Sequence, residues 1–556
     1  KYSASLIQEV NLPHPFTSAS ASGIFGMIGN ETVQTRYKNT NHIASLYKDS
    51  RQLSKLIWSN IGPSSKRFNI EAGLLNKGLN EFKIINEAES SNSEPVFDFL
   101  DISYQRKLIY DEPFEFYSSI QSSDITYIID GKNLIVWNIS NEANPVNRPI
   151  ISLEKTYFRV SIPPDTLQRF FIFKTEDIIK IDELNLIGDK KWDILRSKNN
   201  QAKHIIIGPE DFRSASNALV NHRTETVYTS LENIYDEFSG GNNDPIAIRY
   251  FLNWALNNWN TPPSTVLFMG DADYDYRNIT GQSKMIIPTI QVGKLNTHAT
   301  DDRLVAFNGT IPEMASGRFP ARSIVEVKNF CDKIIEFENN MAGGLWRQKV
   351  TLVADDPSRP EKESFELSIG KSHTSNSEQL SNLIPNFMEI KKLYLVDFEG
   401  VNDGSLFGIT KPSATQQLFD IINSGTSIIN YIGHGNSTQW AQEKLLLLSD
   451  ERNDIESIKT KMKLPLWIAG TCNWGHFDNI SKESFAEELI RTPMDAASAI
   501  ISTSRGISVT GNIQFLNRLF KEIFQKNNFT SKTIGSILQS VKTGGADGEL
   551  FHLFGD

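Results

Sequence analysis

The 556-residue chain has little cysteine and no long hydrophobic run. Its two cysteines, Cys331 and Cys472, are too few for a framework of disulfides. No apolar stretch approaches the roughly 20 residues that a transmembrane helix needs, so no helical membrane span is predicted. Neither end carries a targeting signature or a cap, and we expect further segments of the protein beyond both.

Basic residues are also fewer than acidic ones. Lysine and arginine total 56 against 66 aspartates and glutamates, which gives a formal net charge of −10. Nucleic-acid affinity rests on clustered basic side chains, so no nucleic-acid partner is expected. The 39% of hydrophobic residues and the 10% of aromatic residues do suffice for several packed cores. The length suggests about three or four units of roughly 150 residues.

Residues 1–202 are predicted to form a β-rich N-terminal domain. Short alternating or apolar runs such as DITYIID, NLIVWNI, YFRVSIP and RFFIFK are separated by turn residues. Asp130-Gly131 lies between two of these runs and predicts a hairpin. The number and spacing of the runs favour an antiparallel sandwich.

From residue 203 the pattern changes to apolar strands that alternate with amphipathic helices. Asp244-Pro245 predicts a helix start, with a side-chain acceptor followed by proline at the first helical position. The run STVLFMGD (264–271) is apolar without alternation, as in parallel strands covered on both faces. We predict two α/β subdomains, 203–345 and 346–556, with mostly parallel sheets flanked by helices.

Two predicted strands end in reactive residues. TSIINYIGHG (426–435) ends in a Gly-His-Gly segment around His434, and LPLWIAGTC (464–472) ends in Cys472. Functional groups in open α/β sheets collect beyond the carboxyl ends of strands, so neighbouring strands would bring imidazole and thiol together. The imidazole would activate the thiol as a nucleophile and then protonate the leaving amine. The amides of Gly435 and Cys472 are candidates for an oxyanion hole.

Other interpretations of these residues remain open. His476, four residues after Cys472, is an alternative base, and Cys472, His476, Asp478 and His434 together offer zinc ligands without an established spacing. Cys331 lies in a predicted helix, 324–338, and is expected to be structural.

The same segments resemble the gingipain family of cysteine peptidases, which shares its fold with caspases. GHGNSTQWA (433–441) is similar to the family's histidine motif and TCNWG (471–475) to its cysteine motif, and the 38-residue gap between His434 and Cys472 is of the family's order. The segments 234–254, 266–276, 314–322, 352–358 and 552–556 resemble one branch, the C-terminal signal peptidases or sortases of the type IX secretion system.

The resemblance implies a multidomain protein with a β-rich N-terminal domain and a caspase/gingipain-like α/β core. It further implies a cysteine endopeptidase on the bacterial outer membrane surface. This enzyme would remove the C-terminal signal domain of secreted cargo through a thioester, which is then resolved by water or by transfer of the cargo to anionic lipopolysaccharide. Other outer-membrane proteins of the secretion system would be partners. A general surface peptidase and an inactive module that binds signal domains are the alternatives.

Site roles follow from the matched motifs. Cys472 would be the nucleophile and His434 the general base and acid. The family's acidic residue should follow the LVADD strand, where Glu366 or Glu363 is the candidate and Asp356 lies nearby. The residues expected to bind substrate are Trp440, Trp474 and Asp356.

A calcium site is also expected, although the chemistry itself requires no cofactor. Asp271, Asp273 and Asp275 alternate at a strand end and could present oxygens to Ca²⁺, but the glycine and glutamate of an EF-hand are missing. Asp301-Asp302 and Asp355-Asp356 could complete a site from other loops. A solvated acidic loop is the alternative. Related gingipains bind calcium, so the resemblance favours a calcium site.

Overall fold

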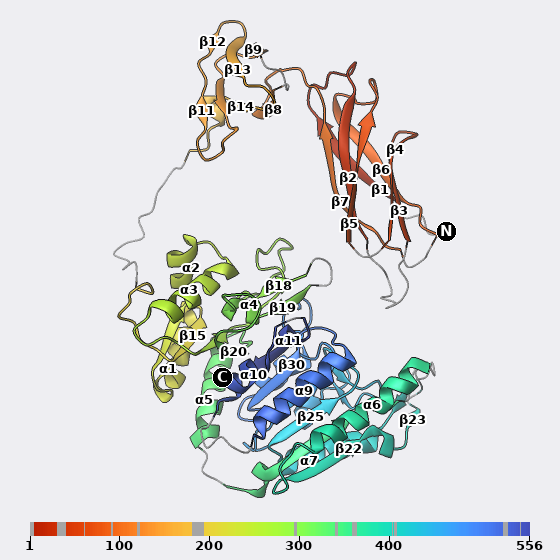
Figure 1. The fold of residues 1–556 in the computed structure, drawn as a ribbon, viewed down its shortest axis with the longest axis vertical. Helices are drawn as coiled ribbons and strands as arrows, with labels where there is room; N and C mark the ends of the chain where they lie inside the picture. Colours follow the sequence, from red (N-terminus) through yellow and green to blue (C-terminus); the bar gives the residue numbers. More distant parts are fainter. Residues whose placement is uncertain are drawn as a thin grey trace. The chain divides into compact units, whose positions relative to one another are not determined.

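The computed structural model separates the chain into two units, Lys1–Gly188 and Asp189–Asp556 (Figure 1). The residues that it describes are 5–29, 41–59, 62–89, 93–118, 123–180, 194–293, 297–339, 343–357, 364–402, 404, 408–525, 532–544 and 546–556. The first unit consists of β-strands, and the second is α/β. No described helix combines the length and the apolar character that crossing a bilayer requires.

The first part of the N-terminal unit is a β-sandwich. One sheet has the order β1-β6-β3-β4 and the other β5-β2-β7, and Phe25, Leu46 and Phe82 fill the core between them. The strands are β1 (Ser5–Leu12), β2 (Ala21–Gly29), β3 (Asn41–Lys48), β4 (Arg51–Ser59), β5 (Gly62–Ile70), β6 (Gly78–Asn86) and β7 (Val96–Ser103).

Two further antiparallel sheets, β11-β10-β14-β8 and β12-β13-β9, complete this unit. The predicted hairpin at Asp130-Gly131 is wrong, because β9 pairs with β13 and β10 pairs with β14. Ile129 and Leu134, on either side of the turn, are both buried, so the chain crosses here from one sheet to the other through their shared core. The strands are β8 (Phe114–Tyr117), β9 (Ser123–Ile129), β10 (Ile135–Asn138), β11 (Val146–Asn147), β12 (Ile151–Ser152), β13 (Thr156–Ile162) and β14 (Arg169–Phe173).

The α/β unit is built on one ten-stranded sheet. Its order is β16 (Thr226–Ser230), β15 (His204–Gly208), β17 (Thr265–Met269), β20 (Ala315–Phe319), β31 (Phe551–Phe554), β30 (Ala499–Thr503), β29 (Leu466–Gly470), β25 (Ile428–Ile432), β21 (Lys349–Ala354) and β22 (Glu389–Tyr394). All neighbours are parallel except β30 and β31, which are antiparallel, so the two halves of the sheet run in opposite directions. The predicted boundary at 345/346 falls inside this unit, before β21.

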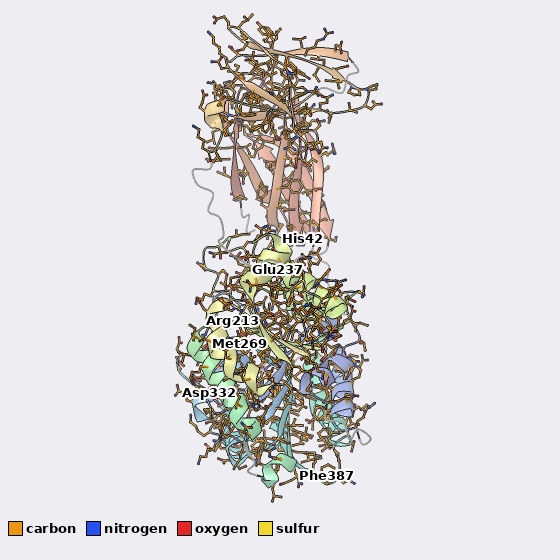
Figure 2. The ribbon with its side chains drawn as sticks, turned by 90° about the vertical axis from the view of Figure 1, so that its left-hand side faces the viewer. His42, Arg213, Glu237, Met269, Asp332 and Phe387 are labelled. Atoms are coloured by element: carbon orange, nitrogen blue, oxygen red, sulfur yellow. The ribbon has the colours of Figure 1, made fainter. Side chains whose placement is uncertain are left out.

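Helices cover both faces of this sheet. One layer contains α1 (Arg213–His222), α5 (Ile324–Asn339), α7 (Pro412–Ser424) and α8 (Phe485–Arg491). The other contains α2 (Leu231–Ser239), α3 (Pro245–Asn258), α6 (Ser364–Ser381), α9 (Val509–Ile523) and α10 (Ile534–Val541). The Asp244 side chain accepts a hydrogen bond from the Ile246 amide (2.8 Å), which confirms the predicted start of α3. Met269 of β17 is fully buried between these layers, whereas Phe387 is exposed (Figure 2).

Shorter elements connect these layers. They are α4 (Asp302–Val305), α11 (Ala546–Glu549), β18 (Ile290–Val292), β19 (His298–Thr300), β23 (Val401–Asn402), β24 (Ile409–Thr410), β26 (Gly435–Asn436), β27 (Gln439–Trp440) and β28 (Leu446–Leu447). Single 3₁₀ turns cover Thr175–Asp177, Glu210–Phe212, Leu345–Gln348, Leu395–Asp397 and Asp454–Ser457. The small sheet β26-β27-β28 directly follows His434.

Candidate active site

His434 and Cys472 follow two neighbouring strands at the same level. β25 and β29 are parallel partners, and Ile432 lies opposite Gly470 in their register. His434 and Cys472 each come two residues after these paired positions. Adjacent strands are about 4.8 Å apart, so the histidine and cysteine loops leave the same edge of the sheet side by side.

The two loops also touch one another. A Cβ atom placed on Gly435 would lie 2.6 Å from the Thr471 hydroxyl oxygen and 2.8 Å from the carbonyl oxygen of Gln439. Only glycine fits this approach without displacing the residue that precedes Cys472. The Gly-His-Gly segment is therefore packed directly against the cysteine loop.

The two cysteines have different surroundings. The Cys472 side chain is half-buried, and its thiol donates at 4.0 Å to the carbonyl of Ile507. The next residue, Asn473, has a φ of 53°, a left-handed conformation that asparagine tolerates and that turns the chain sharply after the thiol. Cys331 is fully buried in α5, and burial raises the pKa of its thiol to about 12. Cys331 thus has the inert environment predicted for it.

The main chain of His434 is held on both sides. Its amide donates to Asp355 Oδ2 at 2.8 Å. Its carbonyl accepts from the Tyr431 hydroxyl at 2.6 Å and from the Ala441 amide at 2.9 Å. Burial, followed by repulsion from Glu443, raises the pKa of Asp355 well above its ordinary value.

The ring of His434 contacts a second imidazole that sequence reasoning missed. His373, from α6, lies with its ring centroid 5.2 Å from that of His434, and the two ring planes are perpendicular. The His373 side chain is only 4% exposed. The surrounding sequence, GKSHTSNS, matches no motif, so only the structure brings this histidine to the site.

The Gly435 amide points away from the hairpin that follows it. The bond from Ala441 N to His434 O makes Gly435 and Trp440 a non-hydrogen-bonded pair of the β26-β27 ladder. In such a pair the N–H groups face outward, so this amide remains directed away from β27. This geometry is compatible with the oxyanion role predicted for Gly435.

The structure describes only some of the acidic candidates. The side chain of Glu366, in α6, and the whole of Glu363 lie outside the described residues. Asp356, expected to bind substrate, is buried and forms an ion pair with buried Lys411. The described carboxylate that contacts His434 is Asp355, and it does so through the backbone amide.

The two tryptophans expected to bind substrate lie in the core. Trp440 and Trp474 are both fully buried, and their ring centroids are 4.9 Å apart. Trp440 also stacks on Tyr431 at 4.4 Å with an interplanar angle of 10°. The substrate-contact role is wrong for this structure, because each indole packs beneath the loop that carries it rather than facing solvent.

His476 belongs to a separate polar group. Its Nε2 atom lies 3.4 Å from Asp478, whose carboxylate binds Arg505 through two hydrogen bonds of 2.6 Å. Burial lowers the pKa of His476. Among the described side chains, the acidic groups compact enough for one ion do not include Cys472 or His434, so the zinc arrangement has no support.

The predicted calcium triad is not one site. Asp273 accepts from the Asp275 and Lys284 amides, and Asp275 accepts from the Ile279 and Thr280 amides, so both carboxylates cap their own loop. The two acid pairs predicted to complete a site differ. Asp301 and Asp302 have the buried cationic partners Arg318 and Lys542. One oxygen each from Asp355, Asp356 and Glu443 lies within 4.8 Å of the others.

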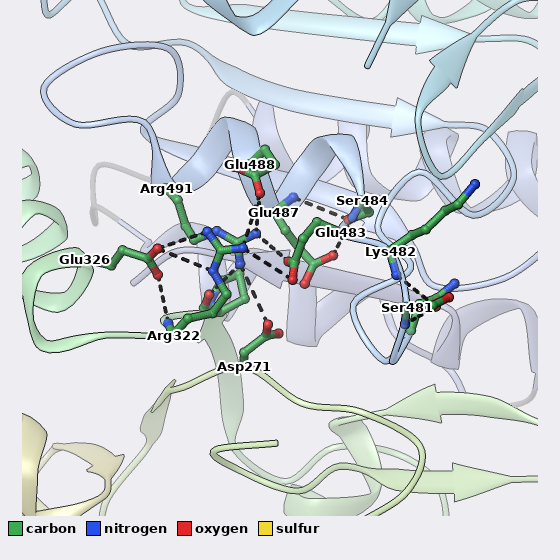
Figure 3. Close-up of polar contacts among 12 residues, drawn as sticks. Asp271, Arg322, Glu326, Ser481, Lys482, Glu483, Ser484, Glu487, Glu488 and Arg491 are labelled. Atoms are coloured by element: carbon green, nitrogen blue, oxygen red, sulfur yellow. Dashed lines mark hydrogen bonds and ion pairs between the residues drawn. The ribbon is translucent and has the colours of Figure 1, made fainter. Parts of the chain in front are cut away.

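Asp271 instead joins two glutamates from around the start of α8 (Figure 3). One oxygen each from Asp271, Glu483 and Glu487 lies within 4.8 Å of the others. Arg491 lies 3.8 Å from Asp271 and 2.5 Å from Glu483. Burial, then repulsion from Glu483, raises the pKa of Asp271 to about 7. Arg491 and Glu483 also line a pocket of about 890 Å³ that Thr438 borders.

Comparison with known proteins identifies the family. The model of peptidase family C25 matches residues 197–556. The chain belongs to peptidase family C25. This match includes His434, Cys472 and the whole ten-stranded sheet.

Individual relatives in family C25 are distant. Lys-gingipain W83 of Porphyromonas gingivalis is 24% identical over 311 residues, which cover 55% of this chain and 16% of the relative. Gingipain R2 of the same organism is 24% identical over 185 residues, 33% of this chain and 22% of the relative. The chain thus spans less than a quarter of the length of these curated relatives.

Two solved structures are similar to this chain. The crystal structure of the Arg-specific cysteine proteinase gingipain R (RgpB) superposes with a TM-score of 0.50 and 20% identity, over 65% of this chain and 78% of that one. Dimeric latent PorU from Porphyromonas gingivalis gives a TM-score of 0.47 and 17% identity, over 60% of this chain and 35% of that one. The predicted fold class, a β-rich region followed by a gingipain-like α/β core, is confirmed.

Proposed function

We propose that this C25 peptidase cleaves peptide bonds with Cys472 as nucleophile and His434 as general base and acid. The proposal rests on one observation. His434 and Cys472 each lie two residues beyond the paired ends of β25 and β29. Gly435 in contact with Thr471 supports it, because that contact holds the two loops together. The proposed chemistry requires no metal or organic cofactor.

The reaction begins with transfer of the Cys472 thiol proton to His434. The sulfur attacks the carbonyl carbon of the scissile bond, and the resulting oxyanion accepts hydrogen bonds from the Gly435 and Cys472 amides. As the carbon–nitrogen bond breaks, His434 gives its proton to the leaving amine. Water or another amine then attacks the thioester and releases the acyl group, which restores the thiol.

We further propose that the substrate is the C-terminal signal domain of proteins secreted by the type IX system, as for PorU. The segments 234–254 and 266–276, which resemble that branch, support this choice. The chain would then act on the bacterial outer membrane surface together with other outer-membrane proteins of that system. Resolution of the thioester by an amine of anionic lipopolysaccharide would attach the cargo to the surface.

The test compares the two cysteines. Cys472→Ala should abolish release of the signal domain from a purified cargo protein, whereas Cys331→Ala, which alters only a buried helix position, should retain it. Mass spectrometry of the products would identify the cleaved bond and any amine that replaces water. Cleavage by Cys472→Ala at the native rate would overturn the assignment.

Two other functions are outcomes of the same experiment. A general surface peptidase should also cut a random peptide library readily, whereas a dedicated signal peptidase should cut only the cargo. An inactive module that binds signal domains should retain the cargo uncut, and its Cys472 should react with iodoacetamide no faster than a simple thiol at the same pH.

Calcium, which the family resemblance implies, would fit at Asp271, Glu483 and Glu487. Carboxylate oxygens are the ligands that Ca²⁺ prefers, and these three converge within 4.8 Å. The raised pKa of Asp271 and Glu487 reflects crowded, buried carboxyl groups that a cation would allow to ionise. We propose that the ion has a structural role, since it would join the end of β17 to α8.

A further inference from the structure

Three buried side chains from three different elements converge on His434. Asp355 follows β21, Tyr431 lies in β25 and His373 lies in α6. Tyr431 is fully buried, Asp355 is 2% exposed and His373 is 4% exposed. A base that must accept a proton from a thiol needs a fixed orientation, and these contacts act on different parts of the same residue.

Asp355 and Tyr431 fix the main chain of His434. The Asp355 carboxylate accepts from its amide at 2.8 Å, and the Tyr431 hydroxyl donates to its carbonyl at 2.6 Å. A Cβ atom on Gly433 would lie 2.3 Å from the Asp355 Cβ and 2.4 Å from the Tyr431 hydroxyl. The two side chains therefore pack closely against the backbone of Gly433, immediately before the histidine.

The Tyr431 ring is itself held rigidly. It stacks on Trp440 at 4.4 Å, and Trp440 packs on Trp474, which follows Cys472 by two residues. The two buried indoles thus link Tyr431, which bonds the His434 carbonyl, to the loop that carries Cys472. A hydroxyl on such a rigid ring defines the position of the His434 carbonyl.

His373 acts on the imidazole. Its ring meets that of His434 edge to face, with centroids 5.2 Å apart and planes at 90°, which is a favourable aromatic arrangement. The contact limits rotation of the His434 ring about its side-chain bonds. Because His373 is itself buried, its own ring is held in place beside that of His434.

We propose that Asp355, Tyr431 and His373 are positioning residues of the peptidase, which hold His434 in the orientation that proton transfer from Cys472 requires. This inference rests on the proposed function. The three residues should therefore affect turnover rather than substrate binding, because none of them is needed to contact the substrate.

The sharpest variant removes one oxygen atom. Tyr431→Phe preserves the ring that stacks on Trp440 but deletes the hydrogen bond to His434. We expect kcat to fall about tenfold with KM unchanged within about twofold. Tyr235→Phe is the matched control, because Tyr235 is a buried tyrosine in α2 whose hydroxyl has no hydrogen-bond partner among the described residues. Its kcat should be native.

The ring contact is tested by a pair of substitutions. His373→Ala should lower kcat about tenfold, whereas His373→Phe keeps an aromatic edge beside His434 and should recover most of the loss. Melting temperatures of all variants show whether a loss of rate follows from unfolding. Equal losses in the alanine and phenylalanine variants would overturn the ring contact as the cause.

Alkylation of Cys472 by iodoacetamide separates this inference from the proposed function, since it needs no substrate. His434→Ala should slow alkylation, and Tyr431→Phe and His373→Ala should each slow it part of the way. If His434→Ala has no effect, His434 does not activate the thiol, and both the dyad and its positioning residues are refuted. If His434→Ala slows alkylation and the other variants behave as native, only the positioning inference is refuted.

Discussion

At the scale of single residues, the candidate site depends on glycines where a methyl group has no space. Gly433 lies between Asp355 and Tyr431, and Gly435 lies against Thr471. Neither requirement concerns backbone conformational freedom, because both come from neighbouring side chains. The Gly-His-Gly motif is thus explained by close packing on both sides of the histidine.

Gly435→Ala should damage catalysis more than stability. The new methyl carbon would lie 2.6 Å from the Thr471 hydroxyl and push the histidine and cysteine loops apart. A displacement near 1 Å can lower the rate about a hundredfold, and we expect a fall of that order in kcat/KM. Gly343→Ala, at a position with no atom within 4 Å of the added carbon, is the control. Native activity of Gly435→Ala would contradict the close approach.

At the scale of elements, the sequence predicts strands better than it predicts their neighbours. The apolar run before Cys472 became β29, and the run before His434 became β25. Their pairing could only be assumed, because parallel partners are separated in sequence by a helix or loop of variable length. The same limitation explains the wrong hairpin at Asp130-Gly131, where a local turn signal lies between strands of two different sheets.

Side-chain roles were harder to predict than strand ends. Trp440 and Trp474 flank the reactive residues in sequence, yet they point into the core, and no local pattern distinguishes the two directions in a short irregular loop. His373 was missed because its contact with His434 depends on how α6 packs against the sheet. The proposed nucleophile and base were accessible from sequence because their type and position after strands carry a chemical signal.

The acidic group that joins β17 to α8 predicts a calcium effect. Calcium should raise the melting temperature by a few degrees over a sample treated with a chelator, and more at pH 8 than at pH 6, because Asp271 must lose a proton to bind it. Asp271→Asn should abolish the shift. Asp273→Asn should retain it, since Asp273 caps its own loop. Loss of the shift in Asp273→Asn alone would favour the loop as the ion site.

At the scale of the whole α/β unit, the last strand joins two half-sheets of opposite direction. β31 is parallel to β20 on one side and antiparallel to β30 on the other. The side chain of Asp556, just beyond it, is 4% exposed and is bonded to two residues of the first half, His204 at 3.1 Å and Arg223 at 2.5 Å. The C-terminal segment is therefore anchored by buried charge as well as by strand pairing.

Asp556 should make stability depend on pH in the acid range. Burial opposes ionisation, but hydrogen bonds and the charges of His204 and Arg223 outweigh it and lower the pKa of Asp556 to about 2. A lowered carboxyl pKa stabilises the fold above its ordinary value near 3.8, and this contribution is lost as pH falls toward 2. Asp556→Asn should lower the free energy of unfolding by about 2 kcal/mol at pH 6.

Urea unfolding of the native protein and of Asp556→Asn, measured from pH 6 down to pH 2, would check this expectation. The difference in free energy between the two should shrink steadily below pH 4. A constant difference across that range would show that the substitution acts through packing instead of through the ionised carboxylate.

The position of β31 also has a consequence for the order of assembly. The strand that separates β20 from β30 consists of residues 551–554, which follow every other described strand in the chain. Its parallel partner β20 ends at residue 319, so their pairing closes a loop of more than 200 residues. During synthesis the two half-sheets cannot be joined through β31 until this segment has been made. We therefore expect the strands that carry His434 and Cys472 to be complete before the sheet itself is closed.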